Sequence, residues 1–383
     1  MSHRLSLFKW ILLFMMLVLP YANVSNFFGV EDGLVYVLYP LSLAFFVAAN
    51  LQKSDIRIPA DSVVIVIYIA LGASVFSYWA GYIEIQHMVN SFLKFVLFVL
   101  LFDLVKSHGH RSANFILMNY SNVFFWSIIL SLIAYIFVRK PEFIFYDGSA
   151  FRFGGFHFEL FSFCFSSAIC CASLIYKDFS RKVVFCILVV LMYVSKSNFS
   201  FIYILIYLVS FHTKILSSLY LRRLCTIAVL TTPVIIGVLL DELGFLSLLS
   251  VRDSTSFDHA GSSVFTRLYP YSLAYSQLIS DGLFSLFPRG FGYFESTDLV
   301  KNDAMSYGGT GSPKELVNLG VIMFSVLIYF IAKKVPKVVP QDLRLFNFVW
   351  FSTIAFISFG AGFFNLFAWT ILASLFNWRK KYV

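Results

Sequence analysis

Charged side chains are scarce in this 383-residue chain: they make up 13% of the residues, whereas 59% are hydrophobic. The mean hydropathy is +0.82. A water-soluble domain of this length needs a more polar surface than this composition supplies. The sequence therefore excludes an ordinary soluble globular protein and predicts a polytopic membrane protein.

Several kinds of functional signal are also missing. The sequence contains no P-loop, HExxH zinc motif, GxSxG element or acidic metal cluster, so we expect no cofactor and a metal-independent chemistry. Basic residues are scattered rather than gathered in a block, which argues against a nucleic-acid partner. The five cysteines lie in or beside apolar runs, where we expect packing rather than disulfides or zinc ligation: Cys164, Cys170, Cys171, Cys186 and Cys225.

Long apolar runs divide the chain into twelve predicted spans, because a bilayer core of about 30 Å needs roughly 20 residues per helix. They are predicted at 10–30, 34–51, 62–82, 90–105, 114–138, 156–176, 183–195, 199–211, 224–241, 315–332, 345–361 and 363–378. The connections on one side hold 19 of the 29 Lys and Arg but only 5 of the 20 Asp and Glu. Lys and Arg are enriched in cytoplasmic loops, so both termini are predicted to be cytoplasmic.

Two connections on the opposite, outer side stand apart within this single integral membrane domain of residues 1–383. We predict a first functional loop at 139–155 and a large loop at 242–314. Long loops are often functional. In the large loop, residues 262–287 have apolar residues at helical spacing and predict an amphipathic helix at the outer interface. "PRGFGYFES" (288–296) is predicted to be a turn.

The stretch "AFRFGGFHFELFSF" (150–163) places three ionisable side chains beside an apolar run. Charges next to membrane spans are candidates for function. Arginine binds phosphate bidentately, and Gly154 and Gly155 let backbone approach a ligand closely. In a helix, Arg152, Gly155 and Glu159 would share one face. The alternative is an Arg152–Glu159 pair that only anchors the helix, and His157 is interpreted as an interfacial residue.

Further basic and glycine residues fall on the predicted outer side, where they suit a phosphate or pyrophosphate group. Lys196 lies between two short apolar runs, in "VSKSNFSF". The other residues predicted to suit this group are Lys94, Arg252, Arg267, Arg289, Gly290, Gly292, Lys301 and Lys314.

The order of these elements resembles bacterial polysaccharide polymerases of the Wzy type and their relatives, the O-antigen ligases. The similarity covers most of the chain and rests on "RFGGF" (152–156), "SKSN" (195–198), Arg267 at the start of a helix, "GFG" (290–292) and "ELVNLG" (315–320). Two departures stand out. Lys196 replaces an arginine that is frequent in the family's hairpin, and "GTGSPKEL" (309–316) lacks the histidine typical of ligases.

The resemblance implies a C-type glycosyltransferase-like fold of about twelve transmembrane helices in the bacterial inner membrane. It also implies a reaction, in which a growing glycan on undecaprenyl pyrophosphate is transferred to the non-reducing end of the next lipid-linked repeat. Arginines stabilise a departing pyrophosphate without a metal. The implied partners are the undecaprenyl-pyrophosphate-linked oligosaccharide and membrane lipid, with a chain-length regulator protein as a further candidate.

The reaction also needs a general base for the acceptor hydroxyl. We assign the pyrophosphate first to Arg267 and Arg152 and then to Arg289. Glu159 is the leading candidate for the base, with His259 and Asp258 in reserve.

Other functions stay open from the sequence. A flippase for lipid-linked oligosaccharides would also suit about twelve helices and a basic cavity, although the large outer loop argues against it. An O-antigen ligase would share the fold and the donor and differ in its acceptor. A membrane acyltransferase or a passive scaffold ranks lower.

Overall fold

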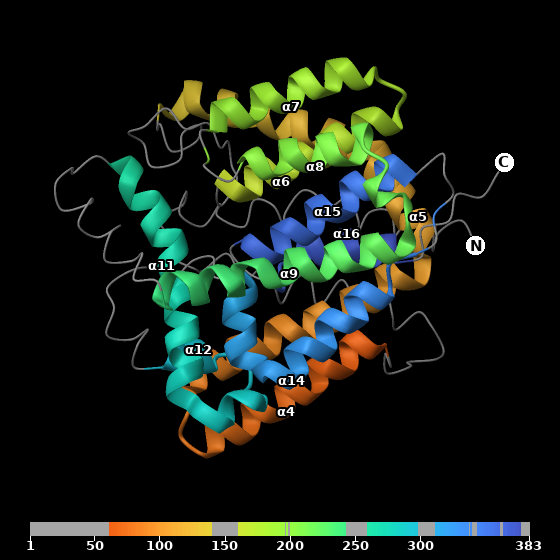
Figure 1. The fold of residues 1–383 in the computed structure, drawn as a ribbon. Coiled ribbons are helices and arrows are strands. Elements are labelled where there is room, and N and C mark those ends of the chain that lie inside the picture. The colour runs from red at the N-terminus through yellow and green to blue at the C-terminus, as the bar shows by residue number, and fades with distance from the viewer. Residues whose placement is uncertain are drawn as a thin grey trace, which may run out of the picture.

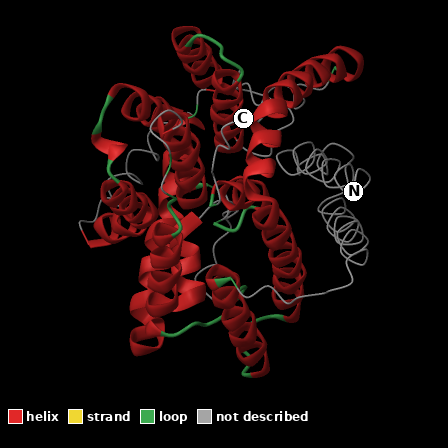
Figure 2. Cartoon of the chain, turned by 90° about the vertical axis from the view of Figure 1, so that its right-hand side faces the viewer, coloured by secondary structure: helices red, strands yellow, loops and turns green. Residues whose placement is uncertain are grey.

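The structure, a computed structural model, describes residues 61–139, 160–195, 197, 200–242, 259–297, 311–336, 338, 343–360 and 363–376. Within these ranges every regular element is a helix and none is a strand (Figure 2). The prediction of an all-α protein is therefore confirmed for the described part of the chain. The predicted spans 10–30 and 34–51 lie outside it.

Eleven α-helices and two short 3₁₀ helices make up the described elements (Figure 1). The α-helices are α4 (Ser62–Trp79), α5 (Ile85–Val138), α6 (Leu160–Tyr176), α7 (Arg181–Ser195), α8 (Ser200–His212), α9 (Leu219–Glu242), α11 (His259–Asp281), α12 (Tyr293–Ser296), α14 (Gly311–Lys333), α15 (Leu343–Phe359) and α16 (Leu366–Leu375). The 3₁₀ helices are η3 (Ile215–Ser217) and η4 (Gly282–Leu286).

Five described segments are long and apolar enough to cross a membrane: Ser62–Trp79, Ile85–Asp103, Arg111–Phe137, Leu219–Glu242 and Gly311–Lys333. Four other apolar helices are shorter, at 10–17 residues. Each of the ten predicted spans from residue 62 onward falls on a described helix. Helices able to span a membrane are thus present, and the count of twelve stays a prediction.

Large apolar side chains are exposed on these helices. The exposed fraction is 86% for Trp79, 82% for Phe137, 78% for Tyr193 and 69% for Phe76. A protein dissolved in water rarely leaves so much apolar surface uncovered. This surface fits a protein whose helices face lipid.

Helix α5 joins two predicted spans, 90–105 and 114–138, but it does not run straight. The Ser112 hydroxyl donates a hydrogen bond to the Val105 carbonyl over 3.2 Å. Seven residues advance about 10 Å along a straight helix, so this contact requires a sharp bend between the two residues. The bend coincides with the predicted connection at Lys106–Arg111, and Figure 1 shows the two arms diverging.

Helices α15 and α16 lie inside the bundle, and nearly all of their residues are buried. A helix that is apolar all round belongs in such a position. Their polar atoms find partners there: the Trp350 indole donates to the Thr226 hydroxyl (3.0 Å), and the Trp369 indole donates to the Phe363 carbonyl (2.7 Å). Around them phenylalanine rings stack, as Phe165 does on Phe356. Packing therefore accounts for many of the 47 phenylalanines.

Helix α11 crosses the ends of α9 and α14 (Figure 1). It confirms a helix where 262–287 was predicted, although the α-helix ends at Asp281 and continues as η4. Tyr271 and Ala274 are each 1% exposed, whereas Ile279 is 56% exposed, so the helix is amphipathic as expected. Its backbone touches α9 at Gly237, where a Cβ atom would lie 2.5 Å from the Tyr271 carbonyl oxygen.

Candidate functional site

The site begins with a break in α14. Gly320 has φ 67° and ψ 163°, a conformation outside the helical region, so α14 consists of two arms that meet at an angle (Figure 1). Glycine is required because a Cβ atom would lie 2.3 Å from the Phe287 carbonyl oxygen. Next to the break, the Asn318 carbonyl accepts hydrogen bonds from the amides of Arg289 (3.0 Å) and Gly290 (2.9 Å). A segment from an earlier part of the chain therefore supplies hydrogen-bond donors to the backbone at the break.

That segment, residues 288–292, is the first part of the turn predicted at 288–296; the rest of that prediction is wrong, because Tyr293–Ser296 form the short helix α12. Gly290 and Gly292 both have positive φ, 97° and 92°. A Cβ atom at Gly290 would lie 2.4 Å from the Cα atom of Ser74 in α4. The Ser74 hydroxyl accepts from the Phe291 amide (2.7 Å), and the Ser77 hydroxyl donates to the Arg289 carbonyl (2.6 Å). Close backbone packing therefore accounts for Gly290, and ligand binding by the two glycines stays a prediction.

Arg289 leaves this turn with its guanidinium among aromatic rings. Its Cζ atom lies 4.9 Å from the ring centre of Phe284, 5.2 Å from that of Tyr293 and 5.7 Å from that of Tyr82. Cation–π contacts of this kind hold a cation in place without neutralising it. In the described part of the chain no carboxylate pairs with Arg289, and its Nε atom is buried without a hydrogen-bond partner.

Four charged side chains lie beside the turn, and we call them the Lys94 cluster: Lys94, Glu295, Lys314 and Glu315. They interact electrostatically with one another. Lys314 forms an ion pair with Glu295, and the two side chains are 24% and 31% exposed. Burial raises the pKa of Glu295, but the charge and hydrogen bond of Lys314 and the charge of Lys94 outweigh it, so the net pKa is lowered. Glu295 is therefore an ionised partner of Lys314.

The other two members of the Lys94 cluster have no ion-pair partner within the described residues. Lys94 is partly buried, and its ammonium lies 5.9 Å from the centre of the Phe95 ring. Glu315 is only 4% exposed and accepts one hydrogen bond, from the Asn318 side-chain amide (3.2 Å). The site thus combines a fixed ion pair with a cation and a carboxyl group that are not paired.

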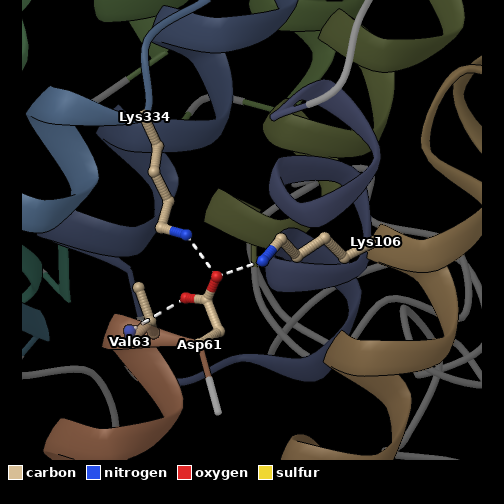
Figure 3. A network of polar contacts seen from close by, with 4 residues as sticks. All are labelled: Asp61, Val63, Lys106 and Lys334. Atoms are coloured by element: carbon tan, nitrogen blue, oxygen red, sulfur yellow. Dashed lines mark hydrogen bonds and ion pairs between the residues drawn. The ribbon is translucent and has the colours of Figure 1, made fainter. Parts of the chain in front are cut away.

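A second charged group lies at the other end of α4, where Asp61 meets Lys106 and Lys334 (Figure 3). Both lysines bond the same carboxylate oxygen, and the other oxygen accepts from the Val63 amide (2.9 Å) and caps α4. Burial raises the pKa of Asp61, but these hydrogen bonds outweigh it and lower the pKa overall. This group, the Asp61 clamp, joins α4, α5 and the end of α14.

The structure brings five of the predicted site residues together: Lys94, Arg289, Gly290, Gly292 and Lys314. His259 and Arg267 lie on α11, but their side chains fall outside the described part. Also outside it are Arg152, Gly154, Gly155, Glu159, Lys196, Arg252, Asp258 and Lys301. The sequence did not reveal the roles of Glu295, Glu315 and Asn318. Two of them could have been noticed, because Glu295 follows "GFG" and Glu315 begins "ELVNLG".

The described residues offer no ready metal site, since no three His, Cys, Asp or Glu side chains among them are grouped closely enough to hold an ion. The site is instead a set of cations and carboxyl groups around a glycine turn. Its cations can bind an anionic group, and its carboxyl groups can accept a proton. No protein-family model, no curated protein and no solved structure matches the chain.

Proposed function

We propose that this protein polymerises polysaccharide repeat units, transferring a growing glycan from undecaprenyl pyrophosphate to the non-reducing end of the next lipid-linked repeat. One observation carries the proposal. The two late elements that resemble the polymerase family, "GFG" and "ELVNLG", contact each other directly through Asn318. This contact sets Arg289 and the Lys94 cluster around one turn.

The chemistry of the proposed reaction suits these residues. The leaving group is a pyrophosphate, which carries negative charge when its bond to the sugar breaks. Fixed cations aimed at such charge lower the barrier without a metal. Arg289 is suitable because cation–π contacts hold it and no described carboxylate neutralises it. Arg152 and Arg267 are proposed to act with it.

The finer assignments belong to the same proposal: twelve helices in a C-type glycosyltransferase-like fold, an inner-membrane location, cytoplasmic termini and outer loops at 139–155 and 242–314. The lipid-linked oligosaccharide is the proposed substrate, and a chain-length regulator is a proposed partner. The Asp61 clamp and the Lys94 cluster lie towards opposite ends of α4 and α14. That arrangement supports placing the site near one membrane surface.

The test is a gel of surface polysaccharide from cells that lack the gene, with lipid-linked intermediates measured alongside. We expect the ladder to disappear while a single repeat stays attached to the lipid core. A bare core with long lipid-linked polymer would instead identify a ligase. A bare core with single lipid-linked repeats retained on the cytoplasmic face would identify a flippase.

Two variants test the residues proposed from the sequence. Complementation with Arg267→Ala should leave short chains, and full-length polymer would remove Arg267 from the site. Glu159→Gln tests the base that the sequence favours: loss of elongation would support Glu159 in that role, and unchanged turnover would remove it.

A further inference from the structure

We propose that Glu315 is the general base that takes the proton from the acceptor sugar hydroxyl. This inference rests on the proposed polymerase function and names a base that the sequence did not suggest. It comes from the position of a buried carboxyl group beside the cations of the site.

Glu315 is buried but only partly bonded. Its side chain is 4% exposed, and one oxygen, Oε2, accepts from the Asn318 amide over 3.2 Å. In the described structure the other oxygen, Oε1, accepts no hydrogen bond. Oε2 of Glu295 is fully buried without a hydrogen-bond partner, whereas Oε1 of Glu315 is not fully buried. One carboxyl oxygen therefore has a free lone pair.

An unpaired carboxyl group inside an apolar helix is costly to stability. Burial without an ion-pair partner destabilises an ionised group, and ionisable groups retained within membrane segments usually serve function. The positive charges of Lys314 and Lys94 offset part of this cost, whereas the charge of Glu295 adds to it. Among the described residues Lys314 pairs with Glu295, and no ion pair joins Glu315 to either lysine.

Asn318 positions Glu315 relative to the turn. Its side-chain amide donates to Glu315, its side-chain oxygen accepts from the Phe294 amide (3.0 Å), and its backbone carbonyl accepts from the amides of Arg289 and Gly290. Asn318 is 1% exposed, so these bonds are shielded from water. The proposed base and the proposed pyrophosphate-binding arginine are therefore held by the same residue.

The acceptor hydroxyl oxygen forms a bond to the anomeric carbon of the donor glycan, and its proton passes to the Glu315 carboxylate. The bond between the anomeric carbon and the pyrophosphate oxygen breaks, and its electron pair leaves with undecaprenyl pyrophosphate. Lys94 and Arg289 stabilise that charge.

The experiment measures chain elongation by purified protein in lipid vesicles supplied with the lipid-linked repeat. The wild type is compared with Glu315→Gln, which keeps the shape and the bond from Asn318 but cannot take the proton. We expect at least about a 100-fold lower rate with unchanged binding of the lipid-linked repeat. Glu242→Gln is the matched control: Glu242 is exposed and accepts a hydrogen bond from Tyr275 away from the Lys94 cluster, so its variant should keep the wild-type rate.

A Glu315→Gln rate within about threefold of the wild-type rate would overturn the inference, and the polymerase proposal would stand. No elongation by the wild type would overturn the polymerase proposal itself. If Glu315→Gln does not fold, Glu315→Asp decides: a slower rate with normal substrate binding supports the base, and a normal rate per folded molecule refutes it.

Discussion

The Asp61 clamp and the Lys94 cluster differ in how many partners their carboxylates have. At the Asp61 clamp, one carboxylate receives two lysines and a backbone amide, and its side chain is 8% exposed. At the Lys94 cluster, two lysines and two glutamates form a single ion pair among the described residues. Along α4, Asp61 of the clamp and Ser74, which contacts the glycine turn, are 13 residues or about 20 Å apart.

The charges of the Asp61 clamp hold the fold together, whereas those of Lys94 and Glu315 are available to a ligand. Within the clamp both carboxylate oxygens of Asp61 are bonded, and removing the carboxylate would take the ion pair from both lysines. At the Lys94 cluster, Lys94 and Glu315 form no ion pair with any described residue. We therefore expect clamp variants to change stability and site variants to change turnover.

The largest effect is expected from Gly290→Ala, because the new Cβ atom would lie 2.4 Å from the Ser74 backbone at a positive φ. We expect a loss of more than about 3 kcal/mol in the free energy of unfolding, since the backbone of α4 cannot move aside. Gly282→Ala is the control: its φ is also positive, at 55°, but its Cβ atom would meet nothing within 4 Å. The thermal midpoint of the purified protein is the measurement, and equal midpoints would contradict the role of the turn.

Arg289→Ala should lower elongation about 100-fold, equivalent to roughly 2.7 kcal/mol of transition-state stabilisation. Its thermal midpoint should stay close to the wild-type value, because the backbone bonds of residue 289 remain. Arg223→Ala is the matched control, because the Arg223 guanidinium donates to the Lys333 carbonyl at the other end of α14. Equal elongation by both variants would remove Arg289 from the site.

Asp61→Asn should cost about 2 kcal/mol of stability, less than a fully buried pair, because Lys106 and Lys334 are 29% and 19% exposed. Turnover per folded molecule should not change. Lys94→Met is the comparison at the other end, and it should leave the thermal midpoint almost unchanged. A greater loss of stability in Lys94→Met than in Asp61→Asn would contradict the idea that the clamp, and not the Lys94 cluster, stabilises the fold.

The smallest effect is the pH dependence of the clamp. The pKa of Asp61 is lower in the folded protein than in the unfolded chain, where it is about 3.9. Its contribution is therefore complete above about pH 4 and is lost as the pH falls through the folded pKa. The difference in thermal midpoint between the wild type and Asp61→Asn should shrink below pH 4. A constant difference down to pH 2 would show that the clamp does not act through charge.

Much of the helical framework was predictable, because apolar runs and their flanking charges are local signals. The prediction of 62–82 matches α4, and 315–332 matches most of α14. The break at Gly320 was not predicted, since a glycine inside an apolar run is compatible with a straight helix. Only the contact with Phe287, 33 residues earlier in the chain, makes that glycine necessary.

The site was predictable in its motifs but not in its contacts. Arg289, Gly290, Gly292 and Lys314 were singled out as charged or glycine residues on the predicted outer side. Which carboxylate pairs with which lysine depends on how α12 and α14 pack, and spacing does not encode that. The pairing of Lys314 with Glu295 therefore had to come from the structure.

The break in α14 also has a consequence for how the protein is made. A backbone carbonyl without a partner is unfavourable in lipid, and the Asn318 carbonyl receives the amides of residues 289 and 290. Those residues precede α14 in the chain, so they leave the ribosome first. The turn can already be in place on α4 when α14 enters the membrane. Because of the order of synthesis, the amides that bond the Asn318 carbonyl are made before the broken helix enters the membrane.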